Sequence, residues 1–323
     1  MRSLRNLLFA ATVLGAGGCS LTQGPAATPI ASPTTVPGTR QSSWTIEGKG
    51  GVSLYRQAWT LPSGSPRATV VLVHGLKDHS NRYGAFAHAL VAHGVAVHAF
   101  DLRGHGHSGG DRVWVSDFSD YIEDLAQVVH GVQREAPGRP VFVFGHSMGG
   151  AIALRYAIEQ QPAIAGLVLS APATSRGKVS NVTASATKVT AGISPWAGLF
   201  QLDASKFSRD PAVTKDMLGD PLVFQAAAPV HTAAELLRTF DEFHERAKDL
   251  RVPVLALHGA ADEITDPDGT KAVVEQAASR DKTLKLYPGL VHDLLHEPER
   301  EVVTRDIVAW VEARVTSATP PSP

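Results

Sequence analysis

The stretch Val141-Phe-Val-Phe-Gly-His-Ser-Met-Gly-Gly150 joins an apolar run of β-forming residues to a Gly-His-Ser-Met-Gly turn. The residues that follow, 151–156, favour a helix. A G-x-S-x-G between a strand and a helix is typical of a nucleophile elbow, in which a tight turn exposes the serine hydroxyl above a sheet. Glycine at positions 145 and 149 tolerates the close approach of backbone that such a turn requires. The stretch therefore predicts Ser147 as a nucleophile, with the positive end of a helix directed at it.

The five-residue motif is weak evidence by itself, because a serine in an ordinary tight turn can match it. The surrounding chain supplies context, since short apolar runs alternate with helical patterns on both sides. This alternation predicts an α/β fold with a mainly parallel, doubly wound sheet, whose functional residues follow the carboxyl ends of the strands. A hairpin is predicted at 44–47 and 52–61, strands at 68–74, 95–100, 141–144, 164–169, 252–258 and 283–287, and helices at 82–93, from 117, after 147, at 233–247, after 267 and at 298–314.

Residues 173–232 interrupt the alternation. They are rich in Ser, Thr, Ala and Pro, with large apolar residues only at isolated positions. We interpret them as a helical cap inserted into a domain that spans residues 44–315. Apolar cap residues are predicted to line a tunnel for an acyl chain, and these are Ile193, Trp196, Leu199, Phe200 and Phe207.

The composition excludes some classes of function. The chain has 323 residues, 43% of them hydrophobic, and a formal net charge of −1. The near-neutral balance lacks the basic excess of a phosphate-binding surface, so no nucleic-acid partner is expected. A single cysteine permits no internal disulfide.

The N-terminus reads as an export signal. Two arginines within Met1–Arg5 precede an apolar run at 7–16 that is too short for a stable membrane span. Cys19 ends a small-residue cleavage site and resembles the acylated cysteine of a bacterial lipobox, although Ala16 stands where Leu is usual. The alternative is a plain cleaved signal with an incidental cysteine.

Low-complexity segments flank the predicted domain. Residues 20–43 are Pro, Thr, Ser, Ala and Gly with few apolar side chains, which predicts a disordered tether, and 316–323 predict a disordered tail. Together with Cys19 they predict an exported lipoprotein anchored on the periplasmic or cell-surface side of a membrane. The sequence leaves the oligomeric state open.

A serine nucleophile needs a base, and the base works best when a carboxylate holds its ring. In the order nucleophile, acid, histidine, the acid should follow the strand after the cap, where Asp262 lies. Glu263 and Asp266 are alternatives for this position. The base should follow the last strand, where His292 lies, and His296 is then expected at the rim of the pocket.

The oxyanion that forms during acyl transfer needs two backbone N–H donors. One comes from the residue after the nucleophile, Met148, and the other from the loop after an earlier strand, where Gly75 lets the backbone of Leu76 approach the elbow. The chain has 14 histidines but no H-E-x-x-H and no Cys-His cluster, so neither a catalytic metal nor another cofactor is expected.

From about residue 52 to 311 the chain resembles the monoacylglycerol lipase branch of the α/β-hydrolases, which is grouped with lysophospholipases and serine aminopeptidases. The motifs that carry the resemblance are His74-Gly75, His79-Ser80, Arg82-Tyr83, Asp101-Leu-Arg-Gly-His-Gly-His-Ser108, Gly145-His-Ser-Met-Gly-Gly150, Leu169-Ser-Ala-Pro172, Asp281-Lys-Thr-Leu-Lys-Leu-Tyr287, His292-Asp-Leu-Leu and Glu297-Pro298.

The resemblance implies the α/β-hydrolase fold, the triad Ser147, Asp262 and His292, the oxyanion donors Leu76 and Met148, and a cap over an acyl tunnel. It also implies that Asp78 and Arg82 face the glycerol end of the substrate. The chain departs from the family here, because the family usually has Gly-Glu where this chain has Lys77-Asp78, and an aromatic residue at the position of Val291.

The expected function is that of a cofactor-free serine esterase acting on monoacylglycerols or related single-chain esters, docked to a membrane by its anchor and through its cap. A lysophospholipase or short-chain carboxylesterase would use the same triad. A serine aminopeptidase, an acyltransferase and a non-enzymatic surface lipoprotein are further alternatives.

Overall fold

The computed structural model describes residues 38–317 except 178 and 202. The predicted signal segment, Cys19, the tether up to residue 37 and the last six residues of the predicted tail lie outside the described residues.

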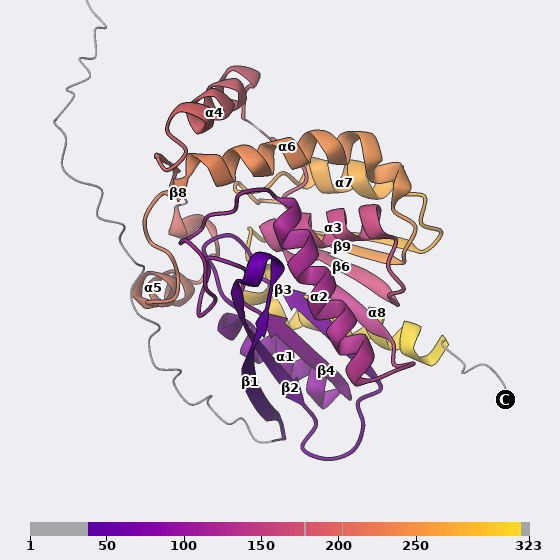
Figure 1. The fold of residues 1–323 in the computed structure, drawn as a ribbon. Helices are drawn as coiled ribbons and strands as arrows, with labels where there is room; N and C mark the ends of the chain where they lie inside the picture. Colours follow the sequence, from indigo (N-terminus) through magenta and orange to yellow (C-terminus); the bar gives the residue numbers. More distant parts are fainter. Residues whose placement is uncertain (1–37, 178, 202, 318–323) are drawn as a thin grey trace, which may run out of the picture.

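An eight-stranded sheet forms the centre of the domain, in the order β1-β2-β4-β3-β5-β6-β9-β10 (Figure 1). β1 and β2 form an antiparallel hairpin, β2 pairs antiparallel with β4, and every other neighbouring pair is parallel. The predicted parallel, doubly wound sheet is confirmed. The strands of this sheet are β1 (Arg40–Glu47), β2 (Ser53–Thr60), β3 (Ala68–Val73), β4 (Val95–Phe100), β5 (Val141–His146), β6 (Gly166–Ser170), β9 (Val254–Gly259) and β10 (Lys282–Tyr287).

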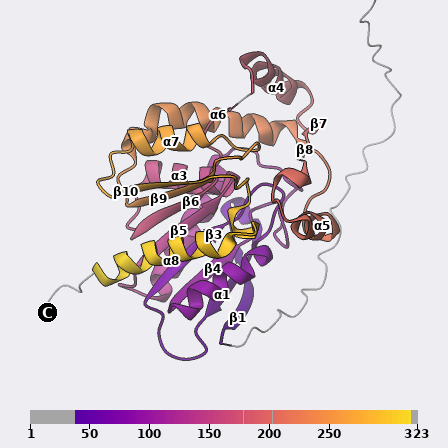
Figure 2. The ribbon, with the colours of Figure 1, turned by 180° about the vertical axis from the view of Figure 1, so that it is seen from behind.

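Helices cover both faces of the sheet. α1 and α8 pack on one face, and α2, α3 and α7 pack on the other, with α6 lying against α3 (Figures 1 and 2). The helices are α1 (Gly84–Ala92), α2 (Ser119–Glu135), α3 (Met148–Gln160), α4 (Asn181–Ile193), α5 (Pro211–Gly219), α6 (Val230–Arg246), α7 (Pro267–Gln276) and α8 (Arg300–Ser317). Short 3-10 helices lie at Lys49–Gly51, Ser80–Tyr83, Ala204–Lys206, Ala247–Asp249 and Leu294–His296.

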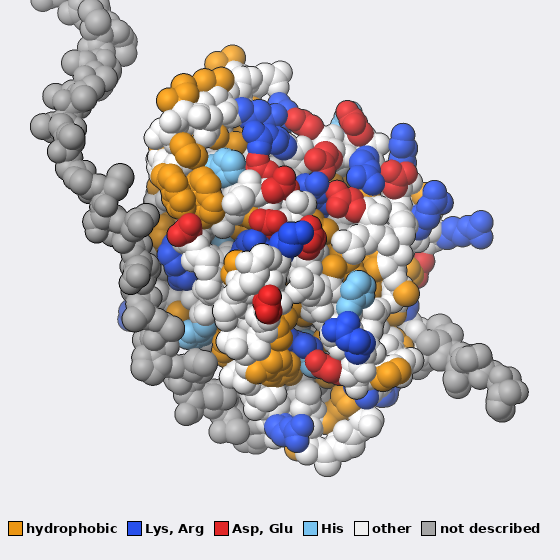
Figure 3. All heavy atoms as spheres, in the orientation of Figure 1, with side chains coloured by type: hydrophobic (Ala, Val, Ile, Leu, Met, Phe, Trp, Pro, Cys, Tyr) orange, Lys and Arg blue, Asp and Glu red, His pale blue; other side chains and the backbone are white. Residues whose placement is uncertain are grey.

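The chain between β6 and α6 forms the cap. It contains α4, α5 and a two-stranded antiparallel ladder of β7 (Gly198–Phe200) and β8 (Ala228–Pro229). Side-chain caps start both helices, because Ser180 Oγ accepts from the N–H of Thr183 and Asp210 Oδ1 accepts from that of Ala212. Hydrophobic side chains gather at the upper left of Figure 3, where α4 and the segment after it lie.

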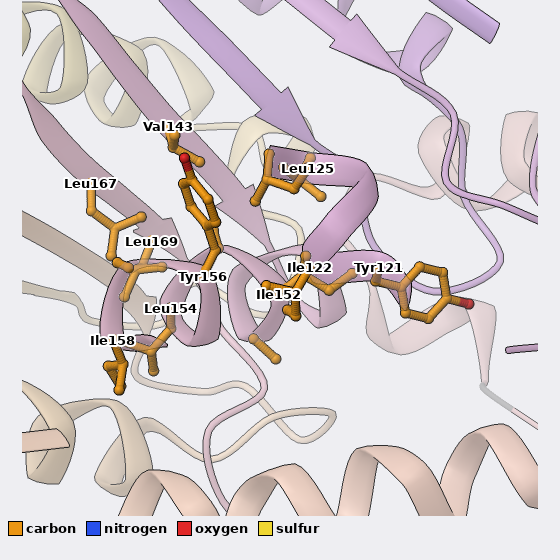
Figure 4. Packing of buried hydrophobic residues seen from close by; sticks show 14 of the residues in the cluster. Tyr121, Ile122, Leu125, Val143, Ile152, Leu154, Tyr156, Ile158, Leu167 and Leu169 are labelled. Atoms are coloured by element: carbon orange, nitrogen blue, oxygen red, sulfur yellow. The ribbon is translucent and has the colours of Figure 1, made fainter. Parts of the chain in front are cut away.

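The sheet separates two apolar clusters. Every residue of β3 is buried, as expected of a strand covered by helices on both faces. On one face, Tyr121, Ile122 and Leu125 of α2 lie beside Ile152 and Tyr156 of α3, against β5 and β6 (Figure 4). Packing of these helices onto the sheet holds the turn between β5 and α3 in place.

Some predicted boundaries were wrong. β1 begins at Arg40, inside the predicted tether, because residues 40–43 pair with 57–60 of β2. Such pairing uses backbone groups and needs no apolar side chain. α8 continues to Ser317, two residues into the predicted tail, and α6 begins three residues before the predicted Ala233. The predicted helix at 82–93 begins as a 3-10 turn and becomes α-helical only at Gly84.

Candidate active site

Ser147 occupies the turn between β5 and α3 with a left-handed backbone, φ 55° and ψ −121°. This conformation is uncommon for a residue with a Cβ and is maintained by crowding around it. A Cβ on Gly145 would lie 2.3 Å from the carbonyl oxygen of Gly149, and one on Gly149 would lie 2.3 Å from that of Val73. Only glycine fits at either position, which confirms the steric role predicted for the motif.

His292 and Asp262 meet at the carboxyl ends of the last two strands. His292 Nδ1 lies 2.8 Å from Asp262 Oδ2, and both side chains are fully buried. A carboxylate only accepts, so Nδ1 carries the proton. The N–H groups of Ile264 and Thr265 donate to Oδ1, and His258 Nε2 lies 3.0 Å from Oδ2.

These contacts keep Asp262 ionised. Burial alone would raise the pKa of Asp262, but His292 and His258 lower it well below its usual range. The two alternative acids have other partners. Asp266 Oδ1 accepts from the N–H of Asp268 at the start of α7, and Glu263 pairs with Lys206. The geometry therefore joins His292 to Asp262.

The ring of His292 lies beside the elbow. Its centroid is 4.8 Å from that of His146, the residue before Ser147. Its Nε2 is buried and has no hydrogen-bond partner among the residues that the structure describes. Because Asp262 occupies Nδ1, Nε2 is the nitrogen left to receive a proton from a nucleophile.

The loop after β3 approaches the elbow from the other side. A Cβ on Gly75 would lie 3.3 Å from Ser147 Cβ. Within the described part of the chain, no acceptor takes the backbone N–H of Leu76 or of Met148. His74 supports this loop as a neutral ring, because its Nε2 accepts from the N–H of Leu102 and burial lowers its pKa. Both predicted oxyanion donors are thus free.

A cavity of about 340 Å³ opens at this loop beneath the cap. The core side contributes Leu76, Lys77 and Asp78. The cap contributes mostly apolar side chains, and α5 and the turn after it supply most of them. The cap residues that line it are Gln201, Asp203, Ala204, Ser205, Phe207, Thr214, Met217, Leu218, Val223, Phe224 and Gln225.

The family model described as "Serine aminopeptidase, S33" matches residues 64–299. The chain belongs to this family. It is 37% identical over 272 residues to the monoacylglycerol lipase of Mycolicibacterium smegmatis, covering 84% of this chain and 97% of that one. It is also 37% identical over 278 residues to the human monoglyceride lipase, covering 84% and 91% of the two chains.

Solved structures agree with this assignment to the S33 family. The Paleococcus ferrophilus monoacylglycerol lipase superposes with a TM-score of 0.71 at 34% identity, covering 81% of this chain and 99% of that one. A soluble variant of the Saccharomyces cerevisiae monoglyceride lipase, in complex with a substrate analogue, gives 0.76 at 25% identity, covering 88% and 98%. The fold is the α/β-hydrolase fold.

In this S33 chain, Asp78 and Arg82 are engaged with each other. Asp78 lines the cavity, but its carboxylate accepts from Arg82 Nη1 at 3.0 Å and from the Tyr83 hydroxyl at 3.1 Å. Burial would raise the pKa of Asp78, yet the positive charge of Arg82 beside it brings it down to about 2. Arg82 Nη2 donates to Asp293 Oδ2 at 3.3 Å. Arg82 itself does not line the cavity. This network ties the oxyanion loop to the residue after His292.

His296 belongs to the same network. Its Nδ1 lies 2.8 Å from Asp293 Oδ1, and its Nε2 lies 3.0 Å from the carbonyl oxygen of Arg82. The ring is mostly buried, and it joins the two loops rather than the cavity lining.

The prediction that Trp196 lines the acyl tunnel was wrong, because Trp196 does not line the cavity. Its ring stacks on Trp114 at 3.8 Å between centroids, and His231 stacks on Trp114 at 4.6 Å. Trp196 is 54% exposed, and Ile193 also faces outward. Leu199 and Phe200 belong to β7, but their side chains lie outside what the structure describes. Of the predicted tunnel residues, Phe207 lines the cavity and packs edge-on against the His292 ring at 5.4 Å.

Met217, Leu218, Val223 and Phe224 line the cavity and were not predicted from the sequence. The Asp210-Pro211 pair is a recognisable helix start and could have located α5. The side of α5 that faces the cavity depends on how the cap folds back over the oxyanion loop, which no local pattern reveals.

The described residues provide neither a metal site nor a membrane-spanning helix. Between residues 38 and 317, leaving out 178 and 202, no group of three or more His, Cys, Asp and Glu side chains is placed to hold a metal ion. Within the same described residues, no helix is both long and apolar enough to cross a bilayer.

Proposed function

We propose that this protein hydrolyses monoacylglycerols through an acyl-enzyme formed on Ser147. The protein is a carboxylic ester hydrolase. The observation that carries the mechanism is the 2.8 Å contact of His292 Nδ1 with a buried Asp262. Beside the elbow, His292 Nε2 has no hydrogen-bond partner among the described residues. The monoacylglycerol and monoglyceride lipases to which the chain is similar support the substrate class.

In the first half-reaction, Ser147 Oγ attacks the ester carbonyl carbon while His292 Nε2 takes the hydroxyl proton. The tetrahedral oxyanion accepts from the N–H groups of Leu76 and Met148, and Asp262 stabilises the imidazolium. When the carbon–oxygen bond to glycerol breaks, His292 returns the proton to the leaving oxygen. Water then repeats the sequence on the acyl-enzyme and releases the fatty acid.

The test is active-site labelling. A fluorophosphonate probe should modify wild type at one residue, Ser147, and Ser147→Ala should lose both labelling and several orders of magnitude of kcat. Ser185→Ala, on the exposed side of α4, serves as the matched control and should behave as wild type. Normal turnover of monoacylglycerol by the Ser147 variant would remove this mechanism.

Attachment to a membrane is proposed on two grounds. Cys19 sits at a lipobox-like cleavage site, and α4 presents an apolar stripe to solvent. Val182 and Ile193 are each 80% exposed, and Val189 lies between them at helical spacing. Exposed apolar patches of this kind are typical of interaction sites. An acylated Cys19 would hold the chain at a bilayer, and the stripe on α4 would dock the cap where the lipid substrate resides.

A further inference from the structure

Lys77 occupies an unusual place in the wall of the cavity. It follows Leu76 directly, is only 7% exposed and lines the cavity beneath the cap. Its φ is 68°, in the left-handed region that side chains with a Cβ seldom adopt. The cap fixes this conformation, because the carbonyl oxygen of Lys77 accepts from the N–H of Phe224 at 3.0 Å.

The ammonium group of Lys77 has no anionic partner among the residues that the structure describes. Its Nζ lies 5.9 Å from the centroid of the Phe224 ring, and the described residues offer it neither a hydrogen bond nor an ion pair. The nearby arginine behaves differently, since Arg82 pairs with Asp78 and Asp293. Burial alone lowers the pKa of Lys77, and no carboxylate raises it.

Both carboxylates that line the cavity already accept hydrogen bonds from neighbouring groups. Asp78 accepts from Arg82, from Tyr83 and from the N–H of His79. Asp203 accepts from the N–H and the hydroxyl of Ser205. Among the described residues that line the cavity, Lys77 is therefore a cation whose charge is not balanced locally, and it lies next to the proposed oxyanion donor Leu76.

Partial burial of an ammonium without a balancing anion is unfavourable, and a left-handed lysine adds strain. Among the described residues, the ammonium contacts only the face of the Phe224 ring, at 5.9 Å from its centroid, and this contact is weaker than an ion pair. An anionic group entering the cavity would remove the imbalance, because charge-assisted hydrogen bonds are strong where water is partly excluded.

We propose that Lys77 determines specificity by selecting esters that carry a carboxylate or a phosphate on the part of the molecule that enters the cavity. This inference rests on the proposed ester hydrolysis at Ser147 and narrows its substrate class. Carboxylate and phosphate share the recognising chemistry, which is an anionic oxygen accepting from Nζ.

The test uses two matched substrate pairs below their critical micelle concentrations. One pair places the charge on the alcohol side: 1-decanoylglycerol and 1-decanoylglycerol 3-phosphate. The other places it on the acyl side: p-nitrophenyl octanoate and the p-nitrophenyl monoester of octanedioic acid. For each pair, the ratio of kcat/KM for the charged member to that for the neutral member is measured. Turnover of the neutral members by wild type tests ester hydrolysis separately from charge selection.

For at least one pair, Lys77→Met should lower this ratio by about tenfold to a hundredfold, as expected for one charge-assisted hydrogen bond. Lys77→Arg should largely keep the wild-type ratio. Lys77→Gly is a second charge-free variant that also relieves the left-handed backbone, so it guards against misfolding. Lys215→Met, at an exposed lysine of α5, should leave both ratios unchanged.

Equal ratios in wild type, Lys77→Met and Lys77→Gly for both pairs would overturn the proposal. So would an equal loss on the charged and the neutral members, because it would mean that Lys77 only supports the loop.

Discussion

At the scale of single residues, the site depends on groups that hold others in place. Ser147 maintains a left-handed backbone at a cost of about 1–3 kcal/mol, and the glycines at 145 and 149 make room for it. Asp262 Oδ2 keeps the His292 ring in one tautomer, and backbone N–H groups donate to Asp262 Oδ1. The backbone of Ser147 and the tautomer of His292 are therefore set before any substrate binds.

Asp262→Asn should lower kcat by roughly a thousandfold to ten-thousandfold while changing KM little. An amide that keeps its oxygen on the backbone donors presents its NH₂ to His292, so Nδ1 must accept and the proton moves to Nε2. The measurement is steady-state hydrolysis of a p-nitrophenyl ester by wild type and variant. Asp266→Asn is the matched control, because Asp266 caps α7 without contacting His292. A larger loss in the Asp266 variant than in the Asp262 variant would reverse the assignment of the acid.

At the scale of elements, the cap has two parts with different contacts. α5 and the turn after it line the cavity, whereas α4 and Trp196 lie outside it. The stack of Trp196, Trp114 and His231 joins the cap to the loop before α2, and His79 pairs with Asp220 just after α5. These contacts connect the cap to the core at separate points.

Met217→Ala should reduce the gain in kcat/KM that longer acyl chains provide, because Met217 is a buried part of the cavity wall. Each methylene buried by the substrate contributes up to about 0.8 kcal/mol, and removing the wall forfeits part of that contribution. Trp196→Ala should leave the chain-length preference unaltered. A series of p-nitrophenyl esters from acetate to decanoate gives, for each variant, the slope of kcat/KM against acyl-chain length. A flattened slope in the Trp196 variant and a normal one in the Met217 variant would contradict the assignment of the cavity.

The His79–Asp220 pair should make stability depend on pH. Burial would lower the pKa of His79, but the hydrogen bond that its Nε2 donates to Asp220 and the charges of Asp78 and Asp101 raise it overall. With its folded pKa above the unfolded value of about 6.5, the pair stabilises fully below that value and loses its contribution as pH rises through the folded pKa.

The comparison is between wild type and His79→Gln in thermal unfolding. Wild type should have the higher Tm at low pH, by roughly 2–4 °C per kcal/mol of pairing, and this advantage should shrink as the solution becomes alkaline. Asp220→Asn should reproduce the effect from the other partner. A constant difference across the pH range would show that His79 stabilises by packing alone.

At the scale of the whole molecule, the catalytic groups and the apolar stripe of α4 lie on one body whose N-terminal extension carries Cys19. A chain that hydrolyses lipid esters gains from being held at the surface where those esters reside. The proposed anchor and the proposed docking of α4 would act together, because a single acyl chain binds a bilayer only reversibly.

The full-length protein expressed in a bacterium should fractionate with membranes and incorporate labelled palmitate at Cys19. Cys19→Ser should do neither. In the Cys19→Ser background, adding Val189→Asp should weaken co-sedimentation with liposomes while the hydrolysis of dispersed short-chain esters continues. Wild type that is released without an acyl group would identify the first residues as an ordinary cleaved signal.

Local patterns along the chain were sufficient to predict much of the fold and of the candidate site. The apolar runs of β3 and β5 and the glycines around Ser147 depend on neighbours in sequence, and the structure has them as expected. The order of strands and loops along the chain was enough to predict that His292 meets Asp262. Tertiary structure alone decided the rest, because those contacts join distant segments. Residues 40–43 form a strand only because β2 lies beside them. Trp196 lies outside the cavity, stacked on Trp114. Within the described part of the chain, Lys77 has no anionic partner, because Arg82 engages Asp78. Spacing within a sequence cannot tell which carboxylate pairs with which cation once the chain has folded.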